Sequence, residues 1–112
     1  MTRKEIFDIL DPVYPCYAIG EHEGLCKEPH IVLKFDNQIN SLNNSQGGWQ
    51  IIHIFCYVPL GDITELDQMI IKVKELLKGK LEDTGTVTPE IIDESIKAYT
   101  RRLTYKKPKE VV

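Results

Sequence analysis

The segment Gly48–Gly79 constrains the fold most, because it places a strand directly before an amphipathic helix. Within it, Trp49–Val58 (WQIIHIFCYV) is rich in β-branched and aromatic residues and is followed by Pro59, a composition that predicts a strand. Neighbouring side chains of a strand point to opposite faces, and here apolar residues occupy both sets of positions. We therefore expect this strand to be central in a sheet and covered on both sides.

The helix that follows is expected to begin at Asp62. Asp62 and Glu65 form a D-x-x-E pattern that resembles a capping box, and Gly79 is suited to the C-terminal end of a helix. The apolar residues between them recur at the spacing of one helical stripe: Leu66, Met69, Ile70, Val73, Leu76 and Leu77. The link between strand and helix is short, so Ile52 and Ile54 of the strand should be buried together with four residues of this stripe, namely Leu66, Ile70, Val73 and Leu77. One helix covers only one face of the strand, and the sequence does not identify what covers the other face.

The rest of the chain predicts further elements around this pair. Thr2 and Glu5 form a capping box that opens a short helix through Leu10, and Thr88-Pro89-Glu90 is typical of the start of a short helix or turn through about Ser95. Three more strands are expected, at Tyr14–Ile19, His30–Phe35 and Ala98–Lys107. The 112 residues should thus form one α+β domain. We expect a mixed or antiparallel sheet of about four strands, with an N-terminal helix and one long amphipathic helix packed on it.

Composition and charge exclude several classes of protein. Hydrophobic residues make up 42% of the chain and charged residues 28%, which argues against disorder. No apolar run approaches the roughly 18 residues that a membrane helix needs. The N-terminal sequence MTRKEIFD lacks the apolar core of a secretory signal, so we expect synthesis in the cytoplasm and no membrane partner. A net charge of −3 gives no reason to expect sequence-specific binding of nucleic acid.

The sequence carries no motif of nucleotide-binding loops or of hydrolase nucleophiles. Four residues of the types that bind zinc occur close together in the sequence, namely Cys16, His22, Cys26 and His30. Their spacings of six, four and four match no standard zinc site, and three cysteines form no disulfide framework, so we expect reduced thiols and no metal or other cofactor. Cys56 and His53 should lie on opposite faces of the central strand and so cannot act as a nucleophile and its base. We therefore expect no catalytic residues.

Charge is separated along the C-terminal part of the chain. Leu81–Ser95 contains acidic residues and no basic one, whereas Lys97–Lys109 contains basic residues and no acidic one. The two segments could be solvated faces of one subunit, or they could pair head to tail between copies of the protein. In the second case the candidate interface residues are Glu90, Asp93, Glu94, Arg101 and Arg102.

A polar segment, Asp36–Gly48, precedes the central strand. Its Asn, Gln, Ser and Gly residues predict a long connection, for example a flexible hairpin loop, that projects from one end of the sheet. Such a loop is either a binding loop or a tolerated surface insertion. The candidate residues for binding a partner are Asn40, Asn43, Asn44 and Gln46.

Two segments together resemble a known family. The first is Gly48–Leu77, a long strand that turns through a short Gly-Asp link into the amphipathic helix. The second is Thr84–Pro108, with its T-P-E-I-I-D stretch and a closing basic strand. They cover about half of the chain and resemble the tail-terminator, or tail-completion, proteins of long-tailed bacteriophages and phage-like particles.

This resemblance implies a small α+β subunit that assembles into a ring, typically of six copies, which caps the tail tube and joins it to the head. The partners would be further copies of the chain, the tail tube protein and the head–tail connector protein. The protein would be part of the virion tail, assembled in the cytoplasm of the host bacterium, and would not be an enzyme. Two other functions stay open: an interaction module of a cellular complex, and a small metal-binding or enzymatic domain that uses the Cys/His cluster.

Overall fold

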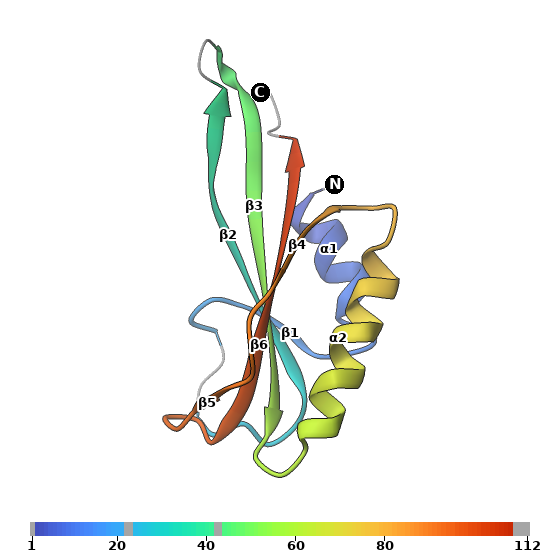
Figure 1. The fold of residues 1–112 in the computed structure, drawn as a ribbon, viewed down its shortest axis with the longest axis vertical. Coiled ribbons are helices and arrows are strands. Elements are labelled where there is room, and N and C mark those ends of the chain that lie inside the picture. The colour runs from blue at the N-terminus through green and yellow to red at the C-terminus, as the bar shows by residue number, and fades with distance from the viewer. Residues whose placement is uncertain (1, 22–23, 42–43, 109–112) are drawn as a thin grey trace.

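The computed structural model describes residues 2–21, 24–41 and 44–108. The elements along the chain are α1 (Arg3–Leu10), β1 (Cys16–Ala18), β2 (His30–Ser41), β3 (Asn44–Pro59), α2 (Ile63–Leu77), β4 (Glu82–Val87), β5 (Ile91–Asp93) and β6 (Ala98–Pro108) (Figure 1). This arrangement confirms the α+β class. Both helices lie on the same side of the sheet.

The sheet has six strands, where the sequence predicts about four. Its order is β1-β2-β3-β6-β4, and β5 pairs with β6 beside β4. β1 is parallel to β2, and the other pairs are antiparallel, so the sheet is mixed. The strand that contains Trp49–Val58 is β3. It lies between β2 and β6, which confirms its predicted central position.

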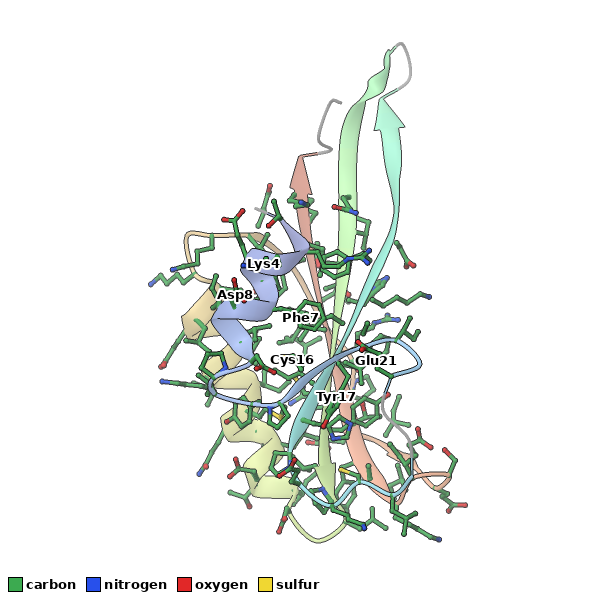
Figure 2. All side chains as sticks on the ribbon, turned by 180° about the vertical axis from the view of Figure 1, so that it is seen from behind. Lys4, Phe7, Asp8, Cys16, Tyr17 and Glu21 are labelled. Atoms are coloured by element: carbon green, nitrogen blue, oxygen red, sulfur yellow. The ribbon has the colours of Figure 1, made fainter. Side chains whose placement is uncertain are left out.

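The hydrophobic core lies between the sheet and the two helices. Strand residues that face the helices are paired across the ladder: Leu33 with Ile54, and Ile54 with Leu103. The predicted core is confirmed, since all six of its members are buried in one cluster, namely Ile52, Ile54, Leu66, Ile70, Val73 and Leu77. α1 adds Ile6 and Leu10 to this cluster. Figure 2 shows Phe7 of α1 between that helix and the strands, with Lys4 and Asp8 on the outer side, where they form an ion pair of 3.4 Å.

The capping interactions predicted at the helix ends are confirmed for α1 but not for the side chain at the start of α2. The capping box at α1 is confirmed, because the Thr2 hydroxyl accepts a hydrogen bond from Glu5 N and the Glu5 carboxylate accepts one from Thr2 N. The Asp62 side chain makes no capping bond to α2, so that part of the prediction is wrong; its carbonyl oxygen instead accepts from Leu66 N. Gly79 follows the helix with φ of 77°, a conformation that glycine adopts without steric cost.

The helix or turn predicted after Thr88 is a short strand, β5, followed by a turn. Thr88 does not act as a helix cap, because its hydroxyl accepts a hydrogen bond from Arg102 N and its own N–H donates to Arg102 O. These bonds fix the chain alongside β6. The segment before Thr88, for which the sequence predicts no strand, contains β4. Its six residues are nearly all exposed, and it pairs with β6 at Glu82, Asp83 and Val87.

The described residues of the polar segment Asp36–Gly48 lie in two antiparallel strands, where the sequence predicts a long connection. Residues up to Ser41 extend β2, and β3 begins already at Asn44. The ladder is irregular here, with register shifts on either side of Ile39. Pairing between two backbones therefore overrides the low strand propensity of Asn and Gly. The hairpin continues past the end of β6 and past the helices, and gives the molecule its long axis of 48 Å (Figure 1).

The sequence predicts that both faces of β3 are covered, but helices of the described residues cover only one face. The two helices cover one face, and no helix of the described part of the chain lies on the other. The loop before β2 crosses that second face at one end, where Cys26 N donates to Ile96 O at 2.7 Å. We call this second face the open face.

None of the helices in residues 2–21, 24–41 and 44–108 is long and apolar enough to cross a membrane.

Ile70 and Ile71 provide a matched test of the helix orientation. Ile70 is 7% exposed and belongs to the core, whereas Ile71 is 60% exposed. Ile70→Ala should lower the free energy of unfolding by ~2–5 kcal/mol, the usual cost of emptying a packed site. Ile71→Ala should change it by less than about 0.5 kcal/mol, as surface substitutions do. Urea unfolding of both variants measures this, and equal losses would show that the buried side of α2 is assigned wrongly.

Candidate interaction surface on the open sheet face

The open face is built by alternate residues of β2, β3 and β6, which the strand register aligns in rows. Each row runs from β2 through β3 to β6. The three rows are Lys34–His53–Thr104, Val32–Phe55–Arg102 and His30–Tyr57–Thr100. The face thus carries an apolar and aromatic centre on β3 with charged and hydroxyl groups beside it, a composition found at protein interfaces.

Aromatic rings pack at the end of this face that the loop crosses. The His30 and Tyr57 rings are stacked with centroids 4.9 Å apart, and Tyr17 of β1 meets His30 edge-on at 5.7 Å (Tyr17 is labelled in Figure 2). Burial raises the pKa of Tyr57, and the nearby Asp93 carboxylate adds to the effect. These contacts rigidify one border of the surface.

A polar group lies at the opposite border, toward the hairpin. His53 Nε2 is 2.7 Å from Asp36 Oδ2, and His53 Nδ1 is 3.3 Å from the Thr104 hydroxyl. Desolvation acts to raise the pKa of Asp36, but the His53 hydrogen bond and the Lys34 charge outweigh it and lower that pKa overall. The predicted separation of His53 from Cys56 is confirmed, because Cys56 is fully buried on the helix side.

The order Thr104–His53–Asp36 is that of a nucleophile, its base and an acid. Acyl transfer also needs free N–H groups that hold an oxyanion. Here the neighbouring backbone is engaged in the ladders of β3 with β2 and β6. We interpret the three side chains as a hydrogen-bonded strip of the surface.

A hollow of about 290 Å³ lies on the open face beside β5. Its walls are Phe55, Thr88, Ile91, Thr100 and Arg102. Ile91 is 52% exposed, and Arg102 Nε is buried with no hydrogen-bond partner in the described part of the chain. The hollow therefore combines apolar walls with a positive charge.

The structure separates the two arginines that the sequence places together. Arg101 lies on the helix side, where its guanidinium is 3.5 Å from Asp67 and donates to Thr88 O at 2.9 Å. Arg102 points to the open face and lines the hollow. Of the two candidates, Arg102 is thus the one available to another molecule.

The acidic candidates lie at the edge of the sheet, on and around β5. Asp93 accepts hydrogen bonds from the backbone and hydroxyl of Ser95, whereas Glu90 and Glu94 are exposed. The acidic and basic segments also contact each other within one chain, through the ion pair of Glu82 with Lys106 at 3.6 Å. The predicted pairing between copies stays a prediction, and Glu90 and Glu94 are its strongest acidic candidates.

Three of the four candidate residues of the polar segment lie in the described strands of the hairpin. Asn40 lies in β2, and Asn44 and Gln46 lie in β3. Asn43 lies outside the described residues. Whether this hairpin binds a partner stays a prediction.

The Cys/His cluster is only partly brought together. Cys26 Sγ is 3.7 Å from His30 Nδ1, but Cys16 pairs with Ile31 on the helix side of the sheet, away from His30. His22 lies outside the described residues. Among those that are described, no three His, Cys, Asp or Glu side chains converge as metal ligands.

The hollow was missed from the sequence because it depends on strand register. Phe55 and Arg102 are 47 positions apart and become neighbours only through the pairing of β3 with β6. Ile91 and Thr88 join them because β5 is a strand, where the sequence favours a helix start. Aligning the predicted strands Trp49–Val58 and Ala98–Lys107 as an antiparallel pair is the signal that could have revealed the Phe55–Arg102 contact.

No protein-family model matches the sequence, and a search of curated proteins returns no significant match.

Two thiols, the buried one of Cys56 and the half-buried one of Cys16, predict how stability depends on alkaline pH. Burial raises the pKa of Cys56 from 9.0 to about 12. Burial, helped by the Asp11 carboxylate, does the same for Cys16. Both pKa values are raised in the folded state only. The free energy of unfolding is therefore fully retained below pH 9, and it falls as the pH rises toward 12, because the unfolded chain ionises its thiols first. Urea unfolding between pH 7 and pH 11 should show this fall beginning near pH 9.

The accessibility of the thiols can be measured separately. Iodoacetamide at pH 8.5 should modify the folded protein far more slowly than the unfolded one. Equal rates of modification would contradict the burial of these thiols.

Proposed function

We propose that this protein is a structural assembly protein of a phage or phage-like tail: a tail terminator whose copies form a ring, cap the tail tube and join it to the head. The observation that carries the proposal is the open face. Half-buried apolar and aromatic side chains lie there on the central strand β3, and no helix of the described residues covers them. Such a face is suited to burial against another protein.

The hairpin of β2 and β3 supports the same function. Beyond the end of β6, the described residues provide two strands only. Two-stranded hairpins are marginally stable in water unless a third strand or another surface packs on them. A surface supplied by the tail tube or a neighbouring copy would meet this requirement. The resemblance of Gly48–Leu77 and Thr84–Pro108 to tail terminators favours a phage tail over other assemblies.

The experiment that tests this function is deletion of the gene followed by electron microscopy of the particles that the strain produces. We expect free heads together with unjoined or overlong tails, and expression of the wild-type chain should restore complete particles. Complete particles in the deletion strain, or a strain that produces no tailed particles at all, would contradict the function and favour an interaction module of a cellular complex.

The same complementation assay tests the hairpin. Replacing residues 40–48 by Asn-Gly, a sequence suited to a two-residue turn, joins the paired residues Ile39 and Trp49. It shortens the hairpin and leaves every core residue in place. We expect this variant to fold with wild-type thermal stability and to leave tails unjoined. Complete particles from the folded variant would show that the hairpin is a tolerated insertion.

A further inference from the structure

The hollow on the open face is lined by Arg102, whose Nε has no hydrogen-bond acceptor within the described part of the chain. Arg102 Nε is buried without a hydrogen-bond partner, and its side chain forms none of the ion pairs found among these residues. Phe55 and Ile91 supply apolar walls beside it. A buried N–H group without an acceptor is costly, and a charge-assisted hydrogen bond to a carboxylate offsets that cost. The hollow is therefore suited to a carboxylate that is attached to an apolar group.

The chain itself presents this chemistry at the edge strand β5. Ile92 is 52% exposed, and the residues on either side of the strand, Glu90 and Glu94, are exposed as well. Neither glutamate belongs to an ion pair of the described residues. The segment Glu90–Glu94 thus combines an exposed apolar side chain with two available carboxylates.

The hollow and this exposed isoleucine lie on opposite sides of the sheet. Ile91 pairs with Thr100 and lines the hollow on the open face, whereas Ile92 pairs with Tyr99, which packs against the core on the helix side. A copy that places its Ile92 in a neighbour's hollow therefore keeps its own hollow available for another copy. Contacts between two different surfaces are heterologous, and they generate rings or filaments rather than closed pairs.

We propose that the Arg102 hollow of one copy binds the Glu90–Glu94 segment of the next copy. Ile92 packs against Phe55 and Ile91 of the neighbour, and a carboxylate of Glu90 or Glu94 accepts hydrogen bonds from the Arg102 guanidinium. The inference rests on the ring assembly proposed above and names the contact that builds the ring.

Charge reversal tests this contact in the full chain. Sedimentation over a concentration series at low ionic strength measures self-association, which should weaken as salt is added. Arg102→Glu should weaken it by about 30-fold or more, as the loss of a desolvated charge pair does, and so should the double variant Glu90→Lys/Glu94→Lys. An equimolar mixture of the two variants should restore association, because each hollow then meets a segment of opposite charge.

Lys72→Glu is the matched control, since it makes the same charge change on the exposed side of α2 and should leave association unchanged. If Arg102→Glu does not fold, the double variant decides alone, because its two residues are exposed. Either variant associating like the wild type, a mixture that fails to restore association, or a wild type that stays monomeric throughout would overturn this contact. The particle phenotype of the gene deletion decides the proposed function separately.

Discussion

The structure depends on one strand that is apolar on both of its faces. β3 pairs with β2 on one edge and with β6 on the other, so its backbone is satisfied along most of its length. On the helix side, Ile52, Ile54 and Cys56 are fully buried under α1 and α2. On the open side, Phe55 and Tyr57 are only half-buried. A strand of this composition organises a core on one side and leaves a second apolar surface, whose burial lowers the free energy further when another protein covers it.

The pair β3–α2 could be predicted because its own side chains specify it. A run of β-branched and aromatic residues ends at Pro59, and Leu66, Ile70 and Val73 then recur at helical spacing. The strands β4 and β5 could not be predicted, because they are held by backbone pairing with β6 rather than by apolar side chains of their own. Thr88 is an example: its sequence context favours a helix cap, and its hydroxyl instead accepts a hydrogen bond from Arg102 N. Long-range pairing of this kind leaves no local signal in the sequence.

The candidate site shows the same division between local and long-range information. The charge separation along the chain identified Arg101 and Arg102 together, but alternation in β6 sends their side chains to opposite faces. Arg101 then forms an ion pair with Asp67 of the same subunit, while Arg102 lies beside Phe55 in the hollow. In the hairpin, too, the described part of β3 before Trp49 pairs with β2 alone, and a two-stranded ribbon depends on further packing for its stability. Open face, hollow and hairpin are thus three consequences of one sheet that is longer and wider than the helices packed on it.

The central claim is that another copy of the protein covers the open face in the assembled state. Hydroxyl-radical footprinting, read by mass spectrometry on the free subunit and on assembled particles, tests it most directly. The account predicts that oxidation of Phe55, Ile91 and Ile92 falls on assembly, whereas oxidation of the core residue Met69 is low in both states. Equal oxidation of Phe55 and Ile91 in the free and assembled protein would contradict the account.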